Sequence, residues 1–150
     1  MCKIINSLKE EAKNTINFIE RLPKFSPEWT EPVPISKRIR IGQNAGLPGV
    51  YRIIYKPTGK VMSVGQGVKV SARKACHTNV FRNKGVALEH NGSYVTDSPV
   101  ARKMFEYDSN IDNWYFSFVT FKESWMARIY EKYLQHKIIP EFNDLGFAGK

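Results

Sequence analysis

Glu131 is the residue of this sequence that packing alone explains least well. It lies in ESWMARIYEKYLQHKI, residues 123–138, whose spacing predicts a helix, and it shares a helix face with Leu134 and Ile138. An unpaired carboxylate is costly to bury, so proteins rarely keep one on an apolar face unless a cation or hydrogen-bond donors meet it. Glu131 is therefore either part of a chemical site or a helix-edge acid that pairs with Arg128 in water.

Basic residues and a tyrosine could act together with such an acid. Lys69, Arg73 and His77 follow one another at intervals of four residues, which places them on one stripe of a predicted helix. Tyr51 lies inside the apolar segment Gly49–Tyr55. A solvated helix face would explain the basic stripe, and most tyrosines in strands are simply core residues.

The elements that must position these groups form a small α+β domain. We predict a β-hairpin from Gly49–Tyr55 and Lys60–Val64, joined by a turn in which Pro57 fixes a corner and Gly59 can take a positive φ. Large aromatics alternate with smaller residues over 113–121, which predicts a third strand. We expect a three-stranded antiparallel sheet flanked by helices.

Helices are predicted from apolar spacing and capping residues. An amphipathic helix covers 4–22, and a short one begins at Ser98. Another helix follows Gly65, with Val68, Ala72, Ala75 or Cys76, and Val80 on the side opposite the basic stripe. Between the first helix and the hairpin lies a proline-rich extended arm, which covers the domain or reaches a partner. We divide the chain into a helix and basic arm, 1–47, and a domain that carries the candidate residues, 48–150, with an insertion at about 83–112.

Composition points to an anionic partner. The 150 residues are 42% hydrophobic and carry a net charge of +9, enough for one compact domain with a strongly basic surface. No acid occurs between Glu31 and Glu89, where most of the excess lysine and arginine lies. Nucleic acid is the commonest partner of such a domain. The alternative without a specific partner is a basic surface that serves solubility alone.

Cysteines and apolar segments bear on the compartment. The only cysteines are Cys2 and Cys76, which suggests no disulfide framework, and Cys76 with His77 lacks a second ligand pair for zinc. No segment has the length and apolarity of a membrane span or the form of a signal peptide. We expect a cytoplasmic protein of a bacterial or phage-infected cell, with no membrane partner and no small-molecule cofactor.

Four blocks in order resemble the GIY-YIG nuclease family. Gly49-Val50-Tyr51 is similar to the first family tripeptide, and Ser63-Val64-Gly65 stands in the place of the second. Arg73 and then His77 follow at the family spacing, as in members of the restriction-enzyme type. The ending is also similar, with helical Glu131 followed by Pro140, an aromatic residue and Asn143.

The resemblance, which covers 48–143, implies phosphodiester hydrolysis with one Mg²⁺ or Mn²⁺ per active site. Glu131 would be the sole protein ligand of the metal, which fits the preference of hard cations for oxygen donors. Tyr51 would take the proton of the attacking water, with its pKa lowered from about 10 by His77 or Arg73. Arg73 would also pair with a phosphate oxygen, and Asn143 would brace the site.

The second tripeptide departs from the family pattern. Ser63 stands where the family has tyrosine, and the spacing from Tyr51 is one residue longer than in the repair nucleases. Lys60 or Lys69 would take over the lost contact with the water or phosphate.

The implied substrate is double-stranded DNA, held by basic residues of the arm, the hairpin and the following helix. The candidate DNA-binding residues are Lys37, Arg38, Arg40, Lys60, Lys69 and Lys74. Because one site cuts one strand, cleavage of a duplex needs either two protomers, as in a homodimer, or two successive encounters.

Two other functions remain open at the level of sequence. In the first, Ser63 marks a catalytically silent DNA-binding protein of the same fold. In the second, the chain is a basic RNA-binding domain whose exposed aromatics stack on single strands. The second needs solvent-facing aromatics, whereas Trp114, Phe116 and Phe118 are predicted to form one buried face.

Overall fold

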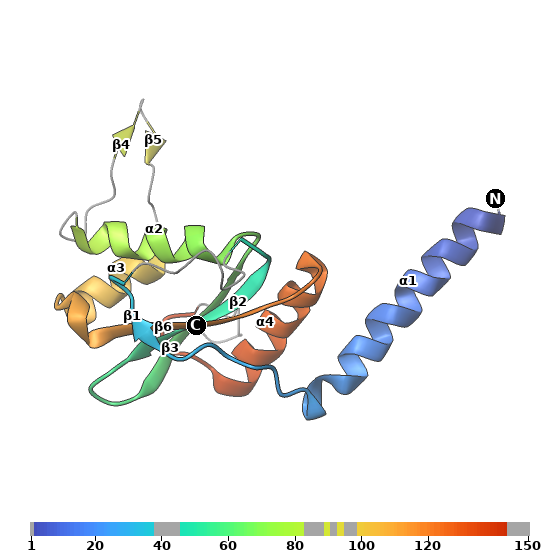
Figure 1. Ribbon diagram of the computed structural model, residues 1–150, viewed down its shortest axis with the longest axis horizontal. Helices are drawn as coiled ribbons and strands as arrows, with labels where there is room; N and C mark the ends of the chain where they lie inside the picture. The colour runs from blue at the N-terminus through green and yellow to red at the C-terminus, as the bar shows by residue number, and fades with distance from the viewer. Residues whose placement is uncertain (1, 38–45, 83–88, 91–92, 95–98, 144–150) are drawn as a thin grey trace, which may run out of the picture.

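The computed structural model describes residues 2–37, 46–82, 89–90, 93–94 and 99–143 (Figure 1). The α+β class is confirmed, but the main sheet has four antiparallel strands in the order β1-β6-β2-β3, one more than the three expected. Its strands are β1 Val33–Pro34, β2 Gly49–Tyr55, β3 Lys60–Gly67 and β6 Trp114–Thr120. The additional strand comes from the arm, because Val33 and Pro34 pair with Phe116 and Tyr115.

Four helices accompany the sheet, and three of them cover its two faces (Figure 1). These are α1 Cys2–Arg21, α2 Val70–Arg82, α3 Pro99–Tyr107 and α4 Ser124–Ile138, with short 3-10 turns at Leu22–Lys24 and Ile111–Asn113. A two-residue pair, β4 Glu89–His90 with β5 Ser93–Tyr94, lies inside the predicted insertion. Among the described helices, none combines the length and the apolarity that a membrane crossing needs.

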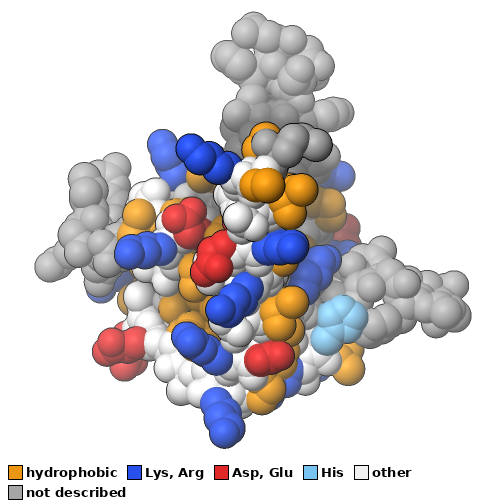
Figure 2. Space-filling view, turned by 90° about the vertical axis from the view of Figure 1, so that its right-hand side faces the viewer, with side chains coloured by type: hydrophobic (Ala, Val, Ile, Leu, Met, Phe, Trp, Pro, Cys, Tyr) orange, Lys and Arg blue, Asp and Glu red, His pale blue; other side chains and the backbone are white. Residues whose placement is uncertain are grey.

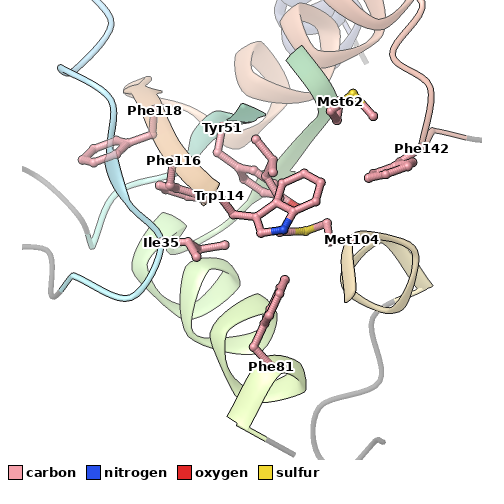
Figure 3. Packing of buried hydrophobic residues seen from close by; sticks show 10 residues of the cluster. Ile35, Tyr51, Met62, Phe81, Met104, Trp114, Phe116, Phe118 and Phe142 are labelled. Carbon is pink, nitrogen blue, oxygen red and sulfur yellow. The ribbon is translucent and has the colours of Figure 1, made fainter. Parts of the chain in front are cut away.

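Each face of the sheet packs its own hydrophobic core. On one face, α2 and α3 enclose the aromatic cluster shown in Figure 3, which includes Tyr51, Trp114 and Phe116. On the other face, α4 packs against Val50 and Val64. The side chains of β2 and β6 thus alternate between two buried faces, and the predicted burial of Trp114, Phe116 and Phe118 is confirmed.

Residues 29–35 of the arm lie along the sheet. The Thr30 amide donates to the Phe118 carbonyl at 2.9 Å, and the Ser117 hydroxyl donates to the Thr30 carbonyl at 2.7 Å. The Arg52 guanidinium lies 4.4 Å from the ring centre of Trp29. This part of the arm therefore belongs to the folded body, whereas Arg38 and Arg40 lie outside the described residues.

The hairpin forms as predicted. β2 and β3 pair from Gly49 with Gly67 to Tyr55 with Lys60, and Gly59 in the turn has a φ of 72°. The register shifts between Ile53 and Ile54, a β-bulge that leaves Met62 without a cross-strand partner.

Asp108 organises the connection between α3 and β6. Its carboxylate accepts hydrogen bonds from the Tyr55 hydroxyl at 2.7 Å, the Asn113 amide group at 2.8 Å and the Asn110 backbone at 2.9 Å. Its carbonyl accepts from the indole of Trp114 at 2.9 Å. The bond from Tyr55 is the main reason that the pKa of Asp108 is lowered below its ordinary value, and the same bond raises the pKa of Tyr55.

The lowered pKa of Asp108 predicts how the free energy of unfolding depends on pH. Because the pKa of Asp108 is lower in the folded chain, its contribution is present above the ordinary Asp pKa of about 3.9 and is lost as pH falls below it. We expect Tyr55→Phe to be less stable than wild type near neutral pH and to lose less stability between about pH 5 and pH 2. Urea unfolding at each pH measures this, and identical acid slopes would contradict it.

Candidate functional site

Tyr51 lies across the backbone of Gly65 on the neighbouring strand. The two residues are partners in the β2–β3 ladder, and a Cβ built on Gly65 would collide with the Oη and Cζ atoms of Tyr51. Only glycine leaves room for the phenol at this place. The glycine of the second tripeptide thus has a direct steric role: it lets the Tyr51 hydroxyl reach edge strand β3.

Two rings hold the phenol from its other sides. Phe116 stacks on Tyr51 with ring centres 5.2 Å apart and planes inclined by 21°, and His77 meets it edge to face at 5.5 Å and 72°. His77 is fully buried and Tyr51 exposes only 3% of its surface. Figure 3 shows Tyr51 and Phe116 side by side in the aromatic cluster above α2. The orientation of the hydroxyl is therefore fixed by packing.

Replacing Gly65 with alanine tests this arrangement. The new methyl group must displace the Tyr51 ring from its place between Phe116 and His77, so we expect Gly65→Ala to lose about 1–3 kcal/mol of unfolding free energy. Gly46→Ala is the matched control, because no atom lies within 4 Å of a Cβ built there, and it should change stability by less than about 0.5 kcal/mol. Equal effects in urea unfolding would contradict the close packing.

The side of α2 that faces the sheet is partly polar. Lys74, His77 and Thr78 are buried against the sheet, while Ala72 and Ala75 on the expected apolar side are exposed. Helix α2 therefore buries part of its polar side and exposes two alanines of the side that the spacing groups as apolar. Burying a lysine and a histidine is costly unless the surroundings compensate, so polar partners must meet this side of α2.

Polar groups on the neighbouring elements explain why the polar side of α2 is buried. Its α2 face presents the ring of Tyr51 to His77, and the arm presents the Ile35 carbonyl, to which the Thr78 hydroxyl is a donor at 3.0 Å. These polar partners favour the polar side of the helix over the small alanines. Arg73 lies in α2 one turn before His77, and its side chain is not among those that the structure describes.

The segment after α4 covers the free edge of β3. The Phe142 amide donates to the Met62 carbonyl at 2.9 Å, and the Val64 amide donates to the side-chain oxygen of Asn143 at 2.8 Å. From α4, the side-chain amide of Gln135 donates to the Val64 carbonyl at 2.8 Å. Both backbone groups of Val64, next to Gly65, are thus held by side chains from the C-terminal part of the chain.

These contacts place Glu131 along β3. The chain enters α4 at the sheet end where Gly49 pairs with Gly67, since the Phe121 amide donates to the Pro48 carbonyl there. The helix ends near Met62, with Gln135 at Val64. Glu131 precedes Gln135 by one turn, about 6 Å along the axis, on the same side of the helix. Glu131 is half-buried, and α4 packs on the face of the sheet opposite the Tyr51 ring.

Ser63 occupies the same side of the sheet as Tyr51. It pairs with Ile53, is 1% exposed, and directly follows Met62 at the β-bulge. The bulge accommodates one residue more on β3 than on β2, and this corresponds to the longer spacing between the two tripeptides. Gly65 keeps its register with Tyr51 as a result.

The predicted DNA-binding lysines lie in different surroundings. Lys37, Lys60 and Lys69 are exposed, and Lys60 forms a surface ion pair with Glu141 at 3.4 Å. Lys60 stands at the hairpin turn, five residues or about 17 Å along the strand from Gly65, so Lys69, just after Gly67, is nearer to Tyr51. Lys74 is 6% exposed and belongs to the buried stripe of α2, so it is not on an open DNA-binding surface.

A divalent cation fits the donors at this edge. Mg²⁺ prefers oxygen ligands, keeps several waters and often uses only one or two carboxylates, so the single half-buried carboxylate of Glu131 is a suitable ligand. Within the described part of the chain, no three His, Cys, Asp or Glu side chains gather as a metal cage. A site with one carboxylate does not require such a group.

The sequence analysis did not identify Gln135 or Thr78. Gln135 follows Glu131 by four residues, so its place on the same side of the helix could have been predicted.

Compared with known proteins, the sequence matches no family model and no curated protein.

Proposed function

We propose that the chain is a metal-dependent DNA endonuclease of the GIY-YIG type. The observation that supports this best is the close approach of Tyr51 to Gly65, with His77 against the phenol ring. Tyr51, Gly65 and His77 belong to the blocks that resemble the family, in which Ser63 departs from the pattern. Glu131 lies on α4, which packs on the face of the sheet opposite the Tyr51 ring, so the proposed site joins the two faces around the edge of β3.

Each residue of the proposed site has a role in the proposed reaction. Tyr51, in its phenolate form, would take the proton of the attacking water through an oxygen that Gly65 and Phe116 orient. Arg73, on the helix that covers this face, pairs with a non-bridging phosphate oxygen. Glu131 would hold Mg²⁺ or Mn²⁺, which would supply Lewis-acid stabilisation of the charge on the phosphate and on the leaving oxygen. Asn143 and Gln135 position Gly65 through the backbone of Val64.

Double-stranded DNA is the substrate that the charge supports best. The chain has a net charge of +9, and Lys37, Lys60 and Lys69 are exposed for phosphate contacts. The alternative of an RNA-binding stacking surface loses support, because Trp114 and Phe116 are fully buried.

A plasmid-nicking assay tests the proposal. We expect supercoiled DNA to become nicked or linear with Mg²⁺ or Mn²⁺, and the reaction to stop with EDTA. If the plasmid stays supercoiled across metals and substrates while a gel shift shows binding, the silent DNA-binding function is correct. The burial of Tyr51 and the serine at position 63 are the observations that favour that second function.

A further inference from the structure

Helix α1 carries an apolar face that the described part of the chain does not cover. Phe18 is its one buried residue, and the helix projects from the body at the end opposite Phe18 (Figure 1). The exposed aliphatic residues are Ile4 (64%), Ile5 (46%), Leu8 (58%), Ile16 (53%) and Ile19 (47%). Figure 2, which looks from the side on which α1 projects, shows hydrophobic side chains exposed among charged ones.

A lone helix of this kind needs a partner. Most helical stability in proteins comes from packing of an amphipathic face, and monomers rarely leave a contiguous apolar patch of this type in water. The spacing of the apolar and small residues along α1 indicates which kind of partner fits this face. Ile5, Leu8, Ala12, Thr15 and Ile19 alternate in steps of three and four, which is the seam of a two-helix coiled coil.

We propose that α1 pairs with α1 of a second copy of this chain, in antiparallel orientation. A symmetric dimer uses the same surface on both subunits, and this stripe is suited to it. Leu8 would lie opposite Ile19 of the partner subunit. Ala12 and Thr15 would meet across the two-fold axis, where small side chains let the two backbones approach closely.

Charge favours a protein partner over a lipid or DNA surface. The α1 segment has four basic residues and three acidic ones, a net charge of only +1 on a chain of +9. The acids are Glu10, Glu11 and Glu20. A helix that binds anionic membranes has a polar face rich in lysine and arginine. The basic character of the chain is thus concentrated outside α1.

Charge also favours the antiparallel orientation. Each body lies at the C-terminal end of its own helix, where Phe18 packs against Phe121 and Trp125. A parallel pair would bring two strongly positive bodies together at one end, where they repel. An antiparallel pair keeps them at opposite ends of a helix about 30 Å long.

The mass of the chain in solution tests this inference. Sedimentation equilibrium between about 1 and 100 µM should show a species of twice the 17.3 kDa of one chain. The double variant Leu8→Glu, Ile19→Glu should shift the dissociation constant upward by about 100-fold or more. The matched control Asn6→Glu, Asn17→Glu adds the same charge on the polar side of α1 and should remain dimeric. Near-UV circular dichroism of Trp114 checks that each body stays folded.

Several results would overturn the inference. These are a wild-type chain that remains at 17.3 kDa, equal weakening by both double variants, or a monomer that sediments with phosphatidylserine vesicles through α1. Cysteine pairing tests the orientation in a Cys2→Ser, Cys76→Ser background. Leu8→Cys mixed with Ile19→Cys should form the mixed disulfide, and self-linkage of Leu8→Cys alone would indicate a parallel pair.

The dimer does not depend on the nuclease proposal, and the two can fail separately. If both hold, the dimer places two sites on one duplex, so wild type makes double-strand breaks in one encounter. The monomeric variant should then accumulate nicked circles while it keeps its nicking activity. A dimer without cleavage would refute only the nuclease, and cleavage by a wild-type monomer would refute only the dimer.

Discussion

Replacing Glu131 with glutamine is expected to abolish metal-dependent nicking while the fold and the affinity for duplex DNA remain. Glutamine keeps the shape of the side chain and removes the charge on which a hard cation depends. Losing several kcal/mol of charge stabilisation at the phosphate should lower the nicking rate by a factor of about 10³ or more. Single-turnover nicking of supercoiled plasmid at saturating Mg²⁺ measures the loss.

The control for this variant is Glu141→Gln. It removes the same charge from the same part of the chain, but Glu141 is an exposed residue whose partner is Lys60 at the hairpin turn. We expect its nicking rate to stay within about threefold of wild type, because surface ion pairs contribute little. Equal rates for Glu131→Gln and Glu141→Gln would show that Glu131 holds no essential metal.

Replacing Tyr51 with phenylalanine is expected to reduce the nicking rate by about 10²–10⁴-fold, the usual contribution of a positioned general base. Phenylalanine keeps the stacking on Phe116 and the edge contact with His77 and loses only the hydroxyl that lies against Gly65. The effect should appear in the chemical step, with duplex DNA bound as tightly as by wild type. The nicking rate of Tyr51→Phe should also lose the part of its pH dependence that comes from deprotonation of a general base.

Tyr115→Phe provides the comparison. Tyr115 lies on β6 of the same sheet and contacts Lys56 through its ring face, which phenylalanine preserves. Its nicking rate and pH profile should match those of wild type. If Tyr51→Phe cleaves at the wild-type rate with the same pH profile, then another group activates the water and Tyr51 is a core residue.

Local chemistry made much of the fold predictable. The hairpin followed from the Pro57 corner, Gly59 and the β-branched residues on both sides, because turn geometry and strand preference are properties of short segments. Helices α1 and α4 followed from apolar periodicity, and α4 ends at Ile138, two residues before Pro140, as the proline predicts. These features need no information about distant parts of the chain.

The features that the sequence did not reveal depend on distant contacts. The orientation of α2 was not predicted because its alanines resemble a core stripe, while the polar side is buried only through Tyr51 and the Ile35 carbonyl. Strand β1 was missed because two residues carry no periodic signal and Pro34 is atypical of strands. The place of Gln135 follows from the β3 edge, which exists only in the folded sheet.

The location of bound Mn²⁺ tests the central claim most directly. The claim is that Glu131, Tyr51 and helix α2 form one cation-dependent site at the edge of β3. Anomalous diffraction from crystals soaked in Mn²⁺ should show one ion bound directly to the Glu131 carboxylate at about 2.0–2.2 Å, with the Tyr51 hydroxyl within one water of it. An ion bound elsewhere, or an empty Glu131 at saturating Mn²⁺, would contradict the account.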